Sequence, residues 1–181
     1  IKFMVSHNNS MENNPNPNER PALSESEEMY LATIARLQEA GQAGPVPLAR
    51  LAEELEVLPV SVNQMIRKLE IAGLVAYLPY KGVDLTTEGT KEALRILRHR
   101  RLWEVFLVEH LHYNTREAAP LACRLEHVFP AEAANRLGVY LGSPVVNPDG
   151  LRIPAAITDP IRIQITPLSQ VRLNGCGMVA E

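Results

Sequence analysis

The stretch LARLAEELEVLPVSVNQMIRKLEIAGLVAYLPYKGVDL, residues 48–85, decides the fold. Its apolar residues first recur at helical spacing, in two segments separated by the short turn Glu56–Leu58, and then form two short runs around a turn that contains Pro79 and Gly82. The predicted elements are helices at about Leu48–Leu55 and Pro59–Ala72 and strands at Leu74–Leu78 and Val83–Leu85. Helix, turn, helix and hairpin, in this order, are typical of a winged helix-turn-helix.

Further helices are predicted on both sides of this motif. Upstream, Ser24 and Glu27 have the spacing of a capping box, and Gly41 ends the helix that follows. Downstream, the predicted helices are Glu88–His110, Glu117–Phe129 and Ala131–Leu141. The chain is therefore expected to be mainly α.

These patterns divide the 181 residues into five parts. Residues 1–22 are rich in Asn and Pro, lack apolar periodicity, and are predicted to be disordered. A winged-helix domain is expected at residues 23–90 and a helical domain at residues 91–142. Residues 143–160, rich in Pro, Gly and Asn, are interpreted as a linker. Residues 161–181 open with alternating isoleucines, which indicate the start of a β-structured segment.

Composition favours a globular protein over a membrane or disulfide-rich one. The chain has no apolar run of membrane-spanning length, no secretory signal pattern and only two cysteines, so we expect a cytoplasmic protein. The net charge is −3, but nine Lys and Arg residues stand against seven Asp and Glu residues between Pro47 and Arg101. A mildly basic segment within an acidic protein supports DNA binding.

The second helix of a helix-turn-helix presents its N-terminal side chains to the major groove of DNA. In this chain these side chains are uncharged at the start of the helix and basic one turn later, which suits base edges first and phosphates next. The candidate DNA-binding residues are Val60, Ser61, Asn63, Gln64, Arg67 and Lys68, with Lys81 at the hairpin tip. The alternatives are an ordinary amphipathic helix with a solvated face, or a winged helix that binds another protein.

A second candidate site lies in the predicted helix Glu117–Phe129. Cys123, Glu126 and His127 are spaced i, i+3 and i+4, so they share one face of a helix. A thiolate, a carboxylate and an imidazole together suit a late first-row divalent metal, and a thioether such as Met29 could be the fourth ligand. The alternative is a half-buried cysteine beside a surface ion pair. A Cys–His nucleophile is disfavoured, because no orienting group or oxyanion hole is evident.

In these motifs the chain resembles the metal-dependent repressors of the diphtheria-toxin-repressor type, which include iron- and manganese-sensing members. The resemblance covers about residues 24–160, and residues 161–181 look like the first part of the family's SH3-like C-terminal domain. The motifs that carry it are Glu28–Leu31, Leu51–Leu55, Lys68–Glu70, Leu85–Thr86 with Gly89, Cys123–His127 and Asn147–Pro154. The resemblance implies a DNA-binding domain, a helical dimerization domain and a divalent metal as co-repressor.

The resemblance also implies metal ligands. The family's primary, activating site maps onto Met29, Cys123, Glu126 and His127, all of which match the iron-sensing pattern. Manganese-sensing members usually have carboxylates in place of the Met and the Cys. Fe(II) is therefore the expected metal, with Mn(II) as the second candidate.

The family's ancillary metal site is matched less well. Glu104 fits, but Arg100 and Ala119 stand where the family has histidines. His99 is one residue from the first of these positions, which rotates it by about 100° around a helix. Either His99 substitutes through a local shift, or the ancillary site is absent.

The expected function is therefore a metal-dependent transcriptional repressor that controls metal homeostasis genes and is not an enzyme. We expect a homodimer on a palindromic double-stranded operator, formed through the apolar stripe Leu102, Val105 and Phe106 and the helix Leu121–Phe129. One rival is a winged-helix regulator with a dead or structural metal site. Another is a metal-binding module that uses its winged helix for protein contacts.

Overall fold

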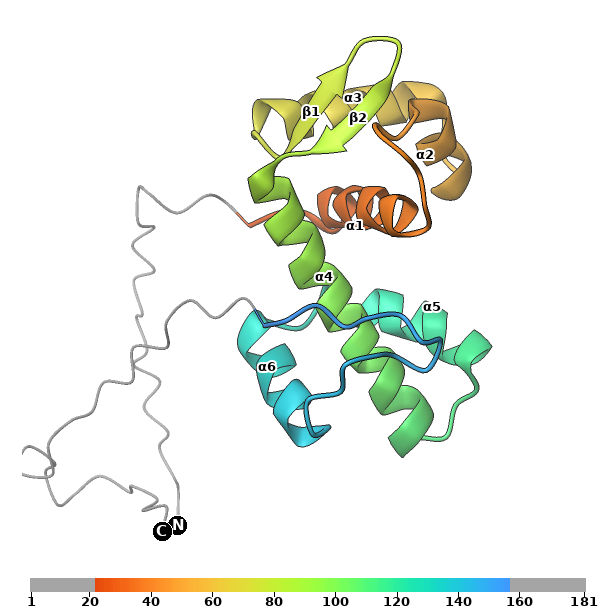
Figure 1. Cartoon of the computed structure of the whole chain (residues 1–181), viewed down its shortest axis with the longest axis vertical. Coiled ribbons are helices and arrows are strands. Elements are labelled where there is room, and N and C mark those ends of the chain that lie inside the picture. Colours follow the sequence, from red (N-terminus) through yellow and green to blue (C-terminus); the bar gives the residue numbers. More distant parts are fainter. Residues whose placement is uncertain (1–21, 157–181) are drawn as a thin grey trace, which may run out of the picture. The chain divides into compact units, whose positions relative to one another are not determined.

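The computed structural model describes residues 22–156 and divides the chain into two compact units, between Ala93 and Leu94. The described part is mainly helical with one small sheet, which confirms the predicted fold class (Figure 1). The elements are α1 (Glu25–Glu39), α2 (Leu48–Glu54), α3 (Pro59–Ile71), β1 (Val75–Leu78), β2 (Gly82–Leu85), α4 (Thr87–Val105), η1 (Phe106–His110), α5 (Thr115–Leu125) and α6 (Ala131–Tyr140). The predicted disordered segment, apart from its last residue, and the predicted SH3-like segment lie outside the described residues.

The N-terminal unit is a winged helix-turn-helix, as predicted. The capping box is present at the start of α1, where the Ser24 hydroxyl accepts the Glu27 N–H and the Glu27 carboxylate accepts the Ser24 N–H at 2.9 Å. β1 and β2 form an antiparallel hairpin in the register Val75↔Leu85 to Leu78↔Gly82. The core consists of fully buried side chains from the three helices and the hairpin: Leu31, Ile34, Leu51, Val62, Ile66, Leu69, Leu74 and Val83.

Glycine is required where the hairpin meets α4. A Cβ on Gly89 would lie 1.8 Å from the carbonyl oxygen of Leu74, so no side chain fits there. At the same place Thr86 joins the start of α4 to the turn between α3 and β1: its hydroxyl donates to the Gly73 carbonyl at 2.8 Å and accepts the Gly89 N–H at 3.0 Å. These contacts tie the start of α4 to the residues that precede β1.

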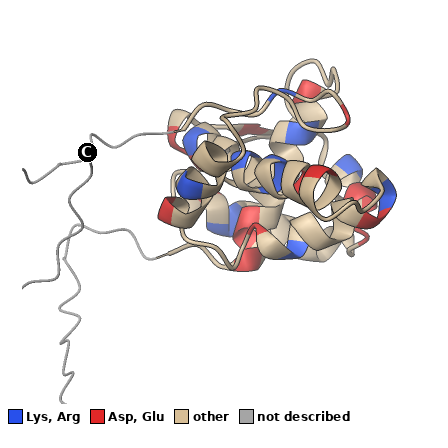
Figure 2. Cartoon of the chain, turned by 90° about the horizontal axis from the view of Figure 1, so that it is seen from below, with Lys and Arg blue, Asp and Glu red and all other residues tan. Residues whose placement is uncertain are grey.

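In the C-terminal unit, two hydrophobic clusters join the end of α4 and η1 to α5 and α6, which lie on opposite sides of this segment in Figure 1. The predicted helix Glu88–His110 is helical throughout, but its last five residues form a short π-helix. The Leu111 N–H donates to the Phe106 carbonyl there at 3.2 Å. Charged residues of both signs are interspersed along the helices (Figure 2). No helix within residues 22–156 is both long and apolar enough to cross a membrane.

The predicted dimer stripe is partly wrong. Leu102 and Val105 are 0% and 1% exposed, because they pack within their own chain against Leu137, Leu141 and Ile153. These two side chains are therefore core residues and are not available to a partner.

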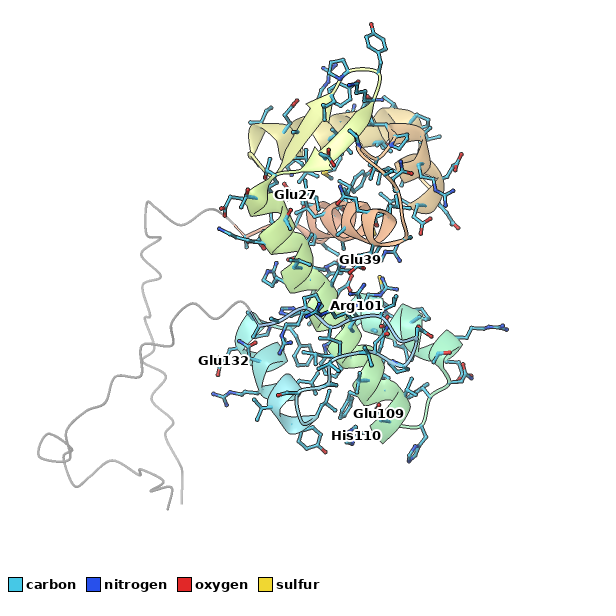
Figure 3. The ribbon with its side chains drawn as sticks, viewed as in Figure 1. Glu27, Glu39, Arg101, Glu109, His110 and Glu132 are labelled. Atoms are coloured by element: carbon cyan, nitrogen blue, oxygen red, sulfur yellow. The ribbon has the colours of Figure 1, made fainter. Side chains whose placement is uncertain are left out.

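Residues 143–156, which were expected to be part of a linker, are folded onto α4. The Asn147 side chain accepts the Leu151 N–H at 2.7 Å, Val146 bridges to Arg152, and Ile153 is 5% exposed. The guanidinium of Arg101, labelled in Figure 3, donates to the Arg152 carbonyl. Pro- and Gly-rich composition here reflects a tight turn closed by Asn147 rather than an extended connection.

Candidate metal centre

The Cys123, Glu126 and His127 cluster lies where α5 ends. The helix was predicted to continue to Phe129, which is wrong: its last residue is Leu125, and a turn leads to Pro130. In this turn the Val128 N–H donates to the Leu125 carbonyl at 3.2 Å, and Pro130 then forms the N-cap of α6.

Cys123, Glu126 and His127 still share one face although the helix ends before Glu126. Glu126 keeps helical backbone angles, φ −58° and ψ −29°, and its N–H donates to the Ala122 carbonyl at 3.0 Å. Cys123 and Glu126 are therefore still one helical turn apart, and His127 follows in the next position.

The structure brings the three predicted ligands together. One ligating atom from each of Cys123, Glu126 and His127 lies within 4.8 Å of the other two. Glu126 Oε1 is 3.2 Å from His127 Nε2 and 3.9 Å from Cys123 Sγ. The Glu126 and His127 side chains are 1% and 6% exposed, so a carboxylate and an imidazole face each other away from water.

This donor set fits a divalent transition metal. A buried carboxylate is costly unless a cation or hydrogen bonds compensate for its charge. Sulfur, nitrogen and oxygen donors that converge from one helical turn are typical of late first-row metals rather than of Mg²⁺ or Ca²⁺.

A positive charge lies beside the cluster. Burial disfavours the charged guanidinium of Arg100, but the carboxylate of Glu126, the hydrogen bond and charge of Glu104, and the charge of Cys123 outweigh burial and raise the pKa of Arg100. Arg100 therefore stays protonated and interacts with two of the three candidate ligands. Residue spacing could not predict this interaction, because it depends on α4 and α5 approaching each other.

The residues considered for the ancillary site do not form a second cluster. Both oxygens of Glu104 are engaged: Oε1 accepts Arg100 Nε at 3.0 Å and Oε2 accepts Asn147 Nδ2 at 2.6 Å. His99 is 2% exposed, and Ala119 brings no donor atom. Within residues 22–156 the converging group of three ligating side chains is the Cys123 cluster. Among these described residues, Glu104 and His99 thus belong to no group of three converging ligands.

Met29, the expected fourth ligand, lies on α1 in the N-terminal unit and is half-buried. It lines an open pocket of about 430 Å³ between α1 and α3, together with Ser61, Gln64 and Lys68. Its thioether therefore lies beside the helix that is predicted to read DNA.

All seven predicted DNA-binding side chains are exposed. Val60 is 59% exposed, and the Asn63 amide donates back to the Pro59 carbonyl at 2.9 Å, which leaves its oxygen for other partners. Lys68 Nζ lies 3.3 Å from Glu27 Oε1 of α1 and is still 60% exposed. This ion pair, which the sequence did not indicate, links α1 directly to α3.

The hairpin tip presents one side chain that the sequence analysis did not select. Tyr80 is fully exposed beside Lys81 and has a left-handed backbone, φ 64°. The Pro-Tyr-Lys-Gly turn predicted the tip but gave no indication that an aromatic ring would project from it.

Two models of iron-dependent repressor domains match the chain. The N-terminal DNA binding domain matches residues 22–83, and the metal binding and dimerisation domain matches residues 86–155. The chain belongs to the iron-dependent repressor family. Both matched models describe repressor domains, and neither describes a catalytic domain.

Individual relatives are described as transcriptional regulators or metal-dependent repressors. An uncharacterized HTH-type transcriptional regulator of Methanocaldococcus jannaschii is 37% identical over 97 residues, 54% of this chain and 78% of that protein. Iron-dependent repressor IdeR of Mycobacterium leprae is 37% identical over 131 residues, 72% of this chain and 56% of IdeR. A solved manganese-dependent transcriptional repressor in complex with manganese is 35% identical, with a TM-score of 0.67, covering 72% of this chain and 59% of that one. The chain thus spans a little over half of the length of IdeR.

Proposed function

We propose that this member of the iron-dependent repressor family is a DNA-binding transcriptional repressor that senses a divalent metal and controls metal homeostasis genes in the cytoplasm. The observation that carries the proposal is the convergence of Cys123, Glu126 and His127, with ligating atoms within 4.8 Å of one another. When bound, the metal supplies a positive centre that holds a thiolate, a carboxylate and an imidazole in one arrangement. The family resemblance supports Met29 as the fourth ligand.

Fe(II) is the favoured metal and Mn(II) the second candidate. The soft donors Met29 and Cys123 support a later first-row ion, since carboxylates suit Mn(II) better. Relatives carry both descriptions, iron-dependent for IdeR and manganese-dependent for the solved repressor.

The path from Met29 to DNA follows contacts within the N-terminal unit. Met29 shares a pocket with Ser61 and Gln64, and the neighbouring Glu27 pairs with Lys68 at 3.3 Å. An event that fixes Met29 therefore also restricts α3, the proposed recognition helix. In a homodimer on a palindromic double-stranded operator, restricting both copies of α3 sets the separation of the two half-site readers. By linkage, DNA increases the affinity for metal by the same factor by which metal increases the affinity for DNA.

The test is fluorescence anisotropy of labelled promoter DNA from the source organism, with apo-protein and added Fe(II), Mn(II), Zn(II) or chelator. We expect metal to increase affinity and His127→Ala to abolish that increase with the fold intact. His112→Asn is the matched control: this histidine is exposed, and asparagine tolerates its left-handed backbone, φ 59°.

The rivals give different results in the same assay. A dead or structural metal site leaves DNA binding unchanged by metal and chelator. A metal-binding module with a protein-binding winged helix binds metal at Cys123 but no promoter DNA. Unchanged metal-dependent binding in His127→Ala would reject the switch itself.

A further inference from the structure

Arg100 interacts with both the metal-ligand cluster and Glu104, and the function proposed above does not use it. Its Nε lies 3.0 Å from Glu104 Oε1, and the Arg100 and Glu104 side chains are only 19% and 11% exposed. The pair is spaced i, i+4 on α4 and is shielded from water, so its geometry is fixed more firmly than that of a surface ion pair.

The second oxygen of Glu104 anchors the folded segment 143–156. It accepts Asn147 Nδ2 at 2.6 Å, and Asn147, 4% exposed, uses its own Oδ1 to accept the Leu151 N–H. A cation that entered between these groups would have to displace the guanidinium and break bonds that hold a buried asparagine.

Arg100 also faces the charges of the candidate metal centre. The charges of Glu126 and Cys123 both stabilise the guanidinium, so this cation lies within electrostatic range of two candidate ligands. A divalent ion bound by Cys123, Glu126 and His127 would be repelled by the same guanidinium, because like charges in a partly buried site are poorly screened by water.

We propose that Arg100 is a built-in cation that takes the place of a second metal ion, holds Glu104 and Asn147 in position, and weakens divalent-metal binding at the Cys123 centre. Arg100 is thus a positioning and tuning residue that sets the metal concentration at which the protein responds. The tuning rests on the proposed metal centre, whereas the structural role of Arg100 toward Glu104 does not. Each chain then binds one activating metal.

The test uses Co(II), whose bond to a thiolate gives a charge-transfer absorption band. Purified full-length apo-protein is titrated with Co(II), following this band, while calorimetry gives the stoichiometry. Arg100→Gln retains a hydrogen-bond donor for Glu104 but removes the charge. Arg100→Lys retains the charge but loses the planar guanidinium.

We expect one Co(II) per chain in the wild type. Arg100→Gln should tighten Co(II) binding roughly tenfold, as removal of a nearby like charge predicts, whereas Arg100→Lys should stay within about twofold of the wild type. A purely structural role would make both variants bind Co(II) equally well or less tightly. Circular dichroism confirms that each variant is folded.

Two results would overturn the inference: two tight Co(II) ions per wild-type chain, or Arg100→Gln binding no more tightly than Arg100→Lys. Failure of the proposed centre looks different. In that case Cys123→Ser would leave the thiolate band and the Co(II) affinity unchanged, whatever residue stands at position 100.

Discussion

Cys123 is the residue whose chemistry most affects the choice of metal. Its Sγ lies 3.9 Å from Glu126 Oε1, within a cluster whose other donors are an oxygen and a nitrogen. A thiolate binds later first-row ions more strongly relative to Mn(II) than a hydroxyl does. The Cys123 sulfur therefore contributes to the expected preference for a later metal, together with the proposed thioether ligand Met29.

The prediction concerns Cys123→Ser. We expect Co(II) and Zn(II) affinity to fall by about 100-fold, since even the outer partners of metal ligands contribute 10–100-fold, and Mn(II) affinity to fall less. Competition titrations with a chromogenic chelator measure both. Arg124→Ala, at the exposed neighbouring position, is the control. Equal losses for Mn(II) and Zn(II) would contradict a preference set by the sulfur, and unchanged affinity for both would mean that the sulfur does not bind the metal.

Residue spacing predicted the Cys123 cluster because all three ligands lie within five positions, where helical geometry alone sets their separation. It could not predict the surroundings of Glu104. Arg100 is one helical turn away, but Asn147 is 43 residues further along the chain and reaches Glu104 only through the fold of residues 143–156. Contacts of this kind follow from tertiary packing, which local periodicity does not report.

At the scale of elements, α3 and the hairpin were predicted to within a residue or two, because turn residues and apolar periodicity agree there. The end of α5 and the segment 143–156 were not. In the first case the chain turns directly after Leu125, with the Val128 N–H donating to the Leu125 carbonyl at 3.2 Å, although the apolar spacing continues. In the second case a Pro- and Gly-rich composition suits a tight packed turn as well as a linker.

The prediction for α3 separates base contacts from phosphate contacts. Gln64→Ala should weaken specific DNA binding by roughly 1–3 kcal/mol and relax the preference at one base pair. Lys68→Ala should weaken binding to specific and random DNA alike and flatten the salt dependence by about one unit of slope. Anisotropy titrations at several salt concentrations with operator and scrambled DNA distinguish the two. If both variants bind as the wild type does, α3 is not the recognition helix.

At the scale of the whole molecule, the proposed homodimer requires an interface on the C-terminal unit. Since Leu102 and Val105 are buried in their own chain, we expect the interface of the proposed homodimer to consist of other side chains. An exposed aromatic group lies where η1 and α6 meet, around His110, which is labelled in Figure 3. The rings of His110 and Tyr140 are 5.4 Å apart, and Phe106 stacks on His110 at 5.6 Å. Tyr140 is 67% exposed, which is a large apolar area to leave in water.

We therefore expect a homodimer at micromolar concentration that includes Tyr140 in its interface, and Tyr140→Glu should shift it to monomer in sedimentation velocity. A buried, unpaired carboxylate opposes association, and a two-fold axis introduces it twice. Tyr80→Glu is the matched control, since this exposed tyrosine lies at the hairpin tip of the N-terminal unit. It should leave the dimer intact and instead weaken DNA binding, because it adds a negative charge beside Lys81. A wild-type monomer with and without metal would contradict the expected assembly, and a stable Tyr140→Glu dimer would place the interface elsewhere on the unit.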